Sequence, residues 1–265
     1  MATLEYPAYL GHIREESRRF RDVLAGCDPA ARVPACPEWD AADLVWHLAE
    51  VQWFWARTVR DRPAPPDDGP HPERPTTYDG LLAAFDAHSS SLVAELEAAG
   101  PDAPAWHWAP VQTVGTSYRR QAHEALIHRL DAEQTAGTVT PLDPALAGDG
   151  VLELLDVMYG GEPPAWGRFE PSAHHVRVDL TDLGTSIWAQ PGLFVGTEPE
   201  SGKVYDGPHV LVVGDPGTDP DAVVAGAAPD LDAWLWRRRD DTGIAITGDR
   251  AAYDGFRVAV DQPLD

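Results

Sequence analysis

The spacing of apolar residues changes part-way along the chain, and this change limits the folds available to it. Up to about residue 161, apolar residues recur every three or four positions over long segments, which indicates amphipathic helices. After about residue 168, short segments alternate between apolar and polar residues, a pattern typical of strands. We therefore predict an all-α domain over residues 1–165 and a small α+β domain over residues 168–265.

Five segments of the first half have helical periodicity. Gly26 ends the first segment, because glycine is a common helix stop, and Asp40 is placed to cap the second. Prolines around residue 65 separate the second helix from the third. Long amphipathic helices joined by short or proline-rich loops predict an antiparallel bundle. The five segments are 5–26, 41–61, 78–100, 114–136 and 144–161.

The second half combines strand and helix signals, as expected of an α+β domain. Pro229 and Asp230 mark the start of one helix, since proline and acidic residues favour the first helical turn. Predicted strands cover 174–182, 185–190, 209–213, 222–226 and 243–249, and predicted helices cover 229–239 and 251–260.

Charge and composition narrow the partners. The chain has 43 acidic against 20 basic side chains, a formal charge of -23, which repels phosphate backbones and anionic lipid. We therefore expect small-molecule partners, with no nucleic acid and no membrane. Cys27 and Cys36 are too few for a disulfide framework or a four-cysteine zinc site. Because the N-terminus lacks the layout of a signal peptide, we expect a cytoplasmic protein. We expect it to be a monomer or a small homo-oligomer.

The stretch HEALIHRLDAE, residues 123–133, places two histidines and several carboxylates on one predicted helix. A zincin motif needs histidines four residues apart, whereas His123 and His128 are five apart, about 140° around a helix. Glu124 and His128 form an i,i+4 pair and share one face. Carboxylate oxygen and imidazole nitrogen are ordinary ligands for zinc and similar divalent ions. Asp131, three residues after His128, is near enough to hydrogen-bond that ring and orient it.

A metal site needs a third ligand, and His47 is the candidate. It lies among apolar residues in DLVWHLAEV, so we expect its side chain to face the bundle interior. A histidine there is either a hydrogen-bonded core residue or a ligand that meets Glu124 and His128 from another helix. The helix alone leaves both possibilities open.

Three separated segments of the chain form a recognisable set: CPEWDAADLVWHLAEV at 36–51, HEALIHRLDAE at 123–133 and VVAGAAPDLDAWLWRRRDDTGIAITGD at 223–249. In this order they resemble the mycothiol-dependent maleylpyruvate isomerase family, over nearly the whole chain. The resemblance implies a DinB-like four-helix bundle followed by an α+β domain similar to sterol carrier proteins. It also implies an actinobacterial source, because mycothiol is the low-molecular-weight thiol of actinobacteria.

The same resemblance implies that His47, Glu124 and His128 bind a divalent metal ion, taken to be zinc, and that mycothiol is the thiol cosubstrate. Three protein ligands leave one coordination position open, as in catalytic zinc sites. The implied reaction is addition of the activated thiolate to a small electrophile such as maleylpyruvate, ending in isomerisation or S-transfer. A bundle metallohydrolase that uses metal-bound water and a non-catalytic metal or apolar-ligand binding protein are the alternatives.

The implied substrate is a dicarboxylate, which an acidic protein binds through local cations. The family pattern W-G-R places an arginine after a glycine at a helix end, and Trp236, Arg237 and Arg238 stand at these positions. We therefore expect Arg238 to be the catalytic arginine, although arginines at a helix end also stabilise the helix dipole. Arg237 stands where the family has glycine, which changes the expected local geometry.

Overall fold

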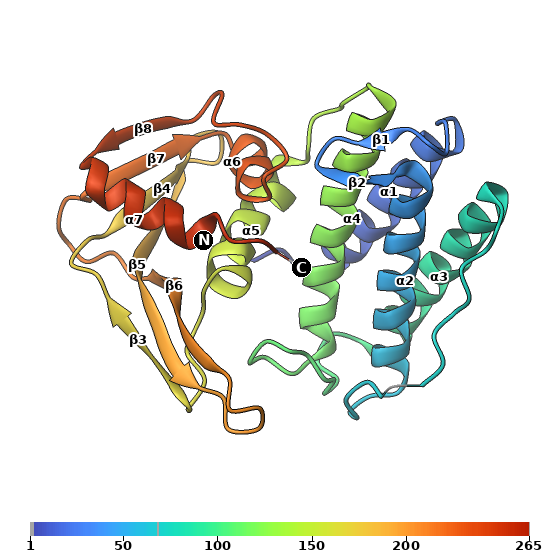
Figure 1. The fold of residues 1–265 in the computed structure, drawn as a ribbon, viewed down its shortest axis with the longest axis horizontal. Coiled ribbons are helices and arrows are strands. Elements are labelled where there is room, and N and C mark those ends of the chain that lie inside the picture. Colours follow the sequence, from blue (N-terminus) through green and yellow to red (C-terminus); the bar gives the residue numbers. More distant parts are fainter. Residues whose placement is uncertain (1–2, 68, 265) are drawn as a thin grey trace. The chain divides into compact units, whose positions relative to one another are not determined.

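A computed structural model describes residues 3–67 and 69–264 of the chain (Figure 1). Most of the predicted helices and strands are present with bounds close to those expected. In chain order the elements are α1 (Tyr6–Ala25), β1 (Arg32–Val33), β2 (Cys36–Asp40), α2 (Ala41–Arg60), α3 (Tyr78–Ala99), α4 (Val114–Ala136), α5 (Pro144–Glu153), the π-helix η1 (Leu154–Met158), β3 (Gly167–Pro171), β4 (Val176–Leu180), β5 (Thr185–Thr197), β6 (Val204–Val213), β7 (Ala222–Gly226), α6 (Ala228–Leu235), β8 (Ala245–Gly248) and α7 (Arg250–Val260).

The chain forms two compact units, and the division differs from the expected one. The helical unit covers residues 4–142, and the second unit begins at Asp143, so α5 belongs to the second unit and not to the bundle. Helix α5 packs against α6. Gly148 of α5 lies close to the turn between β4 and β5, so that a Cβ at Gly148 would clash with the side chain of Leu183. The expected boundary between residues 165 and 168 is therefore too late, because periodicity identifies a helix but not the partner of its apolar face.

Helices α1–α4 form the helical unit and pack alongside one another (Figure 1). Helix α1 packs mainly on α4, and α2 mainly on α3. Phe20 and Phe85 are both in the buried core of this unit, with their ring centroids 4.9 Å apart. Each large apolar side chain buried there contributes about 1.5–3 kcal/mol to folding. The buried cluster also includes Leu24, Val33, Leu44, Val45, Leu48, Leu81, Leu82 and Ala132.

A buried ion network joins α1 to α4. Arg129 Nε donates to Glu16 at 2.7 Å and Arg129 Nη1 donates to Glu133 at 3.0 Å. Arg19 Nε adds a 2.7 Å bond to Glu133, and the backbone N–H of Thr140 donates to the same carboxylate at 2.7 Å. Because buried charges are tolerated only with partners, this network fixes the relative position of the two helices.

A short hairpin precedes α2, where the sequence predicted a loop. Strands β1 and β2 pair antiparallel, with Val33 opposite Cys36. Asp40 then caps α2 as expected: its side chain accepts from the backbone N–H of Asp43 at 2.9 Å, and the side chain of Asp43 accepts from the N–H of Asp40 at 3.1 Å. This reciprocal capping box fixes where α2 begins, and therefore the direction in which its side chains point.

The second unit is a mixed sheet with helices packed on it. The strand order is β3-β5-β4-β7-β8, with β6 paired to β5. Strands β4 and β7 run parallel, and the other pairs are antiparallel. Alternate residues of β4 and β7 are buried, as expected of strands with one face on a core. The sequence did not predict β3, and β5 continues beyond the predicted segment to Thr197.

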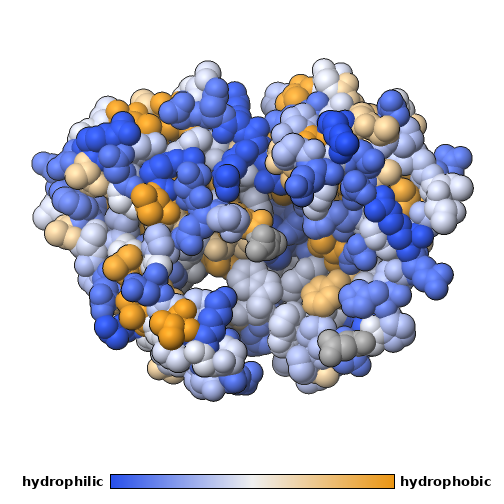
Figure 2. Space-filling model, in the orientation of Figure 1, coloured by the Kyte–Doolittle hydropathy of each residue, from blue (hydrophilic) through white to orange (hydrophobic). Residues whose placement is uncertain are grey.

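Hydrophilic residues cover most of the visible surface, and apolar residues lie there in small separated groups (Figure 2). This distribution agrees with the strongly acidic composition. Within the described residues, no helix has the length and apolar character that crossing a bilayer requires.

Candidate metal centre

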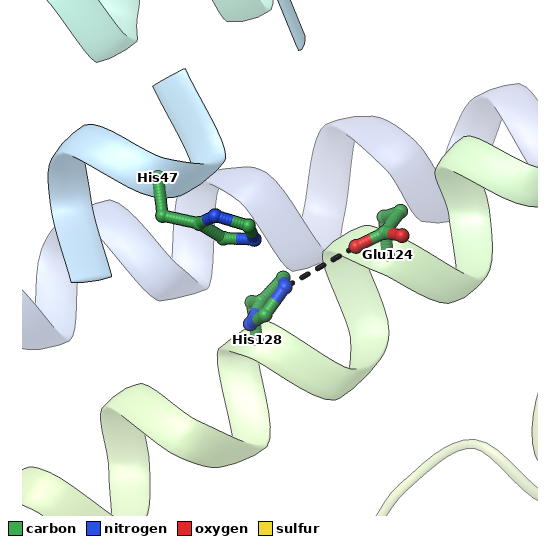
Figure 3. Close-up of side chains that lie close together, drawn as sticks. All are labelled: His47, Glu124 and His128. Carbon is green, nitrogen blue, oxygen red and sulfur yellow. Dashed lines mark ion pairs between the residues drawn. The ribbon is translucent and has the colours of Figure 1, made fainter. Parts of the chain in front are cut away.

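The helical unit brings together three side chains that can act as metal ligands. His47 from α2, and Glu124 and His128 from α4, each offer one ligand atom, and these atoms all lie within 4.8 Å of one another. Figure 3 shows the three side chains pointing towards one another across the space between the two helices. The residues chosen from the sequence therefore meet in the fold.

Helical geometry explains why two of the three ligands come from one helix. Glu124 and His128 are one turn apart on α4, and His128 Nε2 lies 3.2 Å from Glu124 Oε2. His123 packs elsewhere, as its spacing predicted: its ring lies against Tyr9 of α1, with the ring centroids 6.3 Å apart. The helix register therefore separates the histidine of the cluster from the one that packs against α1.

His128 lies between two carboxylates. Its Nδ1 is 3.0 Å from Asp131 Oδ2, and its Nε2 faces Glu124. Burial disfavours the charged ring, but hydrogen bonds and charges from Asp131 and Glu124 outweigh burial and raise the pKa of His128. Asp131 is fully buried, which makes its contact with the ring a fixed one. This contact leaves Nε2 as the nitrogen that points into the cluster.

Glu124 has a second partner that the sequence did not suggest. Arg120, one turn earlier on α4, places Nη2 3.1 Å from Glu124 Oε1. Burial opposes ionisation of Glu124, but the positive charges of Arg120, His128 and His47 lower the pKa of Glu124 well below its usual range. The carboxylate is therefore ionised and available as a ligand at neutral pH. An arginine inside a helix normally indicates a solvated face, so only its i,i+4 spacing from Glu124 could have identified it.

The third ligand is held by an aromatic contact. The rings of Trp39 and His47 have centroids 4.7 Å apart, and those of His47 and His128 have centroids 4.8 Å apart. Trp39 is in β2, immediately before the capping box of α2. The hairpin that the sequence did not predict thus supplies the side chain that packs against His47.

The donor set fits a divalent ion. Two imidazoles and one carboxylate are typical of catalytic zinc, whose ligands at about 2.0–2.1 Å lie roughly 3.4 Å from each other. His128 and Glu124 already have about that separation, at 3.2 Å. All the ligand atoms lie within 4.8 Å of one another, so the widest pair would move closer by at most about 1.4 Å. Three protein ligands also leave a coordination position open.

Comparison with known proteins identifies the family. Residues 10–133 match the domain family described as "Mycothiol maleylpyruvate isomerase N-terminal domain", and residues 145–255 match "MDMPI C-terminal domain". The chain belongs to the mycothiol maleylpyruvate isomerase family. The segment between the two matched regions, residues 134–144, contains the point where the chain passes from one compact unit to the other.

Two solved structures have the fold of this family member. They are crystal structures of the mycothiol-dependent maleylpyruvate isomerase and of a variant in which one histidine is replaced by alanine, with TM-scores of 0.59 and 0.60. Each is 13% identical in sequence, and each alignment covers 93% of this chain and 96% of the other. At this identity the likeness shows the fold alone. Comparison with curated proteins finds no match.

Arg237 stands at the end of α6, at the position where the W-G-R pattern has glycine. Helix α6 ends in a Schellman motif, in which the N–H of Arg237 donates to Trp234 O and the N–H of Arg238 donates to Ala233 O. Arg237 has a φ of 62°, in the left-handed region where glycine is usual. The local backbone conformation thus forms with arginine in place of glycine.

Arg238 itself lies just after that turn. Its Nη1 donates to the backbone oxygen of Trp236 at 2.8 Å, and its guanidinium lies 5.9 Å from the Trp236 ring centroid. These contacts position the side chain within the second unit. The role of Arg238 in binding a substrate carboxylate stays a prediction.

His107 is buried in the loop before α4. Its ring stacks on Trp55 with centroids 4.9 Å apart, and its Nδ1 accepts a hydrogen bond from the N–H of Ala109 at 2.9 Å. Burial, with a smaller contribution from the charge of Arg120, lowers the pKa of His107 to about 4. Its neutral ring is therefore a packing element of the helical unit.

Proposed function

We propose that this chain is a metal-dependent thiol isomerase or S-transferase. In this proposal a small thiol, mycothiol in the family, adds to an electrophilic substrate such as maleylpyruvate. The observation that carries the proposal is the convergence of His47, Glu124 and His128 in a member of the mycothiol maleylpyruvate isomerase family. A chain that only carried an apolar ligand would not need three such side chains from two helices.

In this proposal three residues bind the metal ion, and their neighbours hold the ligand side chains in position. A divalent ion held by His47, Glu124 and His128 would supply a Lewis acid that favours the thiolate form of a bound thiol. Asp131 holds the ring of His128 so that Nε2 faces the cluster, and Trp39 packs against the ring of His47. Arg120 holds one oxygen of Glu124. These contacts hold the ligand side chains in place before the ion binds.

The isomerisation itself needs no net change of protons or electrons. The thiolate sulfur forms a bond to one alkene carbon, and the alkene electron pair moves towards the neighbouring carbonyl as an enolate. The former double bond then rotates. The enolate electron pair re-forms the alkene in the trans arrangement as the carbon–sulfur bond breaks, which regenerates the thiolate. We propose that Arg238 binds a carboxylate of the substrate during this sequence.

Metal content is the first measurement that tests this proposal. We expect near-stoichiometric zinc or a similar divalent ion in the purified wild-type protein, and little in His128→Ala. His123→Ala is the matched control, because His123 is a buried histidine of the same helix that packs against Tyr9 and lies outside the cluster. Absence of metal from the wild type, even after reconstitution, would rule the proposal out.

Thiol dependence separates the proposed reaction from hydrolysis. With metal-loaded protein, we expect the cis-to-trans conversion of maleylpyruvate to require mycothiol and to be lost in His47→Ala. A protein that binds metal but consumes ester or amide substrates without any thiol would instead be a hydrolase that uses metal-bound water.

A further inference from the structure

A buried arginine lies one helical turn before a candidate metal ligand. The side chain of Arg120 is 3% exposed, and its Nη2 lies 3.1 Å from Glu124 Oε1. Removing a guanidinium from water is unfavourable unless a partner compensates. Here an ionised partner is Glu124, whose other oxygen faces the histidines. The positive charge of Arg120 and the negative charge of Glu124 therefore both lie next to the candidate metal centre.

The two oxygens of Glu124 have different partners. Oε1 is held by Arg120, whereas Oε2 lies 3.2 Å from His128 Nε2. A divalent ion among His47, Glu124 and His128 would therefore meet Oε2, while Oε1 stays with the guanidinium. One oxygen per carboxylate keeps the coordination number low and leaves space for an exogenous ligand.

The same arginine sets the charge of the centre. Glu124 and Asp131 each bring one negative charge, and the two histidines are neutral when they bind a metal. With Arg120, a centre that holds a divalent ion has a net charge of about +1, whereas without Arg120 the net charge would be about zero. The charge of Arg120 also acts beyond Glu124, because it contributes to the low pKa of His107.

We propose that Arg120 is a positioning residue that makes this centre prefer an anionic ligand. It keeps Oε1 of Glu124 away from the ion, and it keeps the open coordination position electropositive. A thiolate is such a ligand, so this inference rests on the function proposed above and extends it. An arginine with only a structural role would stabilise the fold, but it would not raise the affinity of the metal-loaded centre for an anionic ligand.

The test measures two affinities that should change in opposite directions. Arg120→Met keeps an unbranched stem but removes the guanidinium and its charge. We expect Co²⁺ affinity, measured by competition with a chelator, to stay the same or increase, because a cation has left the neighbourhood of the ion. We expect the affinity of the Co²⁺-loaded protein for 2-mercaptoethanol, followed by its sulfur-to-cobalt absorption band, to fall at least about tenfold.

Two further variants separate charge from shape. Arg120→Lys keeps the charge without the planar fork, and we expect it to recover most of the thiol affinity. Gln121→Met alters the next residue of α4, which is also fully buried, without changing charge, and we expect both affinities to stay at wild-type values. Parallel losses of metal and thiol affinity in Arg120→Met, or unchanged thiol affinity, would overturn the proposal for Arg120.

The wild-type results keep the two proposals distinguishable. If the wild type binds Co²⁺ but no thiol, the proposed function fails, and thiocyanate then replaces the thiol as an anionic probe of the open position. A tenfold weaker thiocyanate affinity in Arg120→Met would still support the role of Arg120. A wild type that binds no metal would overturn both proposals.

Discussion

Two helix ends of this protein make the same hydrogen bonds with different residues at the left-handed position. Helix α4 is followed by Gly137, with a φ of 73°, and α6 is followed by Arg237, with a φ of 62°. In both, the N–H groups of the left-handed residue and of its successor donate to carbonyls of the last turn. Only glycine adopts this conformation without a steric penalty, so the end of α6 carries strain that the end of α4 does not.

Replacing this strained residue should stabilise the protein. We expect Arg237→Gly to raise the free energy of unfolding by about 1 kcal/mol, because glycine relieves the clash between Cβ and the backbone. Arg237→Ala is the control, since it removes the exposed side chain and its 3.7 Å contact with Asp261 but keeps the Cβ. Urea denaturation of the three proteins measures the difference. Equal stabilities of the glycine and alanine variants would show that any gain over the wild type comes from removing the arginine side chain, and not from relief of backbone strain.

His107 makes stability depend on pH in the acidic range. Its pKa of about 4 in the folded protein lies below the usual value near 6.5, so the unfolded chain binds the proton more tightly. The contribution is fully present above pH 6.5 and is lost as the pH falls from 6.5 to 4, and it amounts to about 3 kcal/mol. We expect His107→Gln to flatten the pH dependence of the unfolding free energy over this range. An unchanged slope would contradict the buried neutral ring.

Asp131 should control metal affinity without touching the metal. Its 3.0 Å contact with His128 Nδ1 fixes the ring, and loss of such a partner weakens metal binding about 10- to 100-fold. We expect this loss in Asp131→Ala, measured by chelator competition. His123→Ala, on the same helix, should bind metal as the wild type does. Wild-type affinity in the Asp131 variant would mean that the ring is held by packing alone.

At the level of elements, a buried guanidinium of α4 contributes to the contact between α1 and α4. Arg129 serves both Glu16 and Glu133, and burial raises the pKa of Glu16 despite the nearby arginine. Without Arg129, two carboxylates would remain buried beside each other. The network therefore joins α1 to the helix that carries two of the three candidate ligands.

Removing this guanidinium should be strongly destabilising. We expect Arg129→Met to lower the free energy of unfolding by about 3–5 kcal/mol, the usual effect of leaving a buried charge unpaired. Arg18→Met, which removes an exposed arginine of α1, should change stability little. Thermal and urea unfolding measure both. Glu133 keeps its bond to Arg19 in the Arg129→Met variant, so Glu16 is the carboxylate that loses its arginine. If an added Glu16→Gln substitution did not restore part of the loss, the buried carboxylate of Glu16 would not be its cause.

The sequence predicts helices and strands better than it predicts their partners. The positions of α1–α4 and the ligand pair Glu124 and His128 follow from periodicity, because side chains one turn apart share a face. The hairpin before α2 and strand β3 do not follow, since their short segments lack a clear alternation. Arg120 has no sequence signal beyond its spacing. Its importance comes from burial, which depends on tertiary packing.

For the whole molecule, the position of the boundary has a direct consequence for fragments. All three candidate ligands and the core around Phe20 lie between residues 4 and 142. The buried face of α5 instead packs against α6 in the second unit. A fragment that ends at residue 165 would therefore expose the apolar residues of α5, including Leu146 and Val151.

We expect a fragment of residues 1–142 to fold cooperatively and to bind metal with an affinity near that of the full chain. A fragment of residues 1–165 should bind a hydrophobic dye and self-associate, because it carries an uncovered helix. Circular dichroism, dye fluorescence and light scattering compare the two. A monomeric, dye-free 1–165 fragment beside an unfolded 1–142 fragment would place the boundary after α5.

The placement of the candidate ligands on two helices also gives the ion a mechanical role. His47 and Glu124 are far apart along the chain, with α3 and its flanking loops between them, so an ion shared by them would close a long loop, as a cross-link does. Its binding energy would then count towards the folding of the bundle, and α2 could not separate from α4 without releasing the ion. The ion would thus act as a reversible cross-link between α2 and α4, and the concentration of available metal would set the lifetime of the folded protein.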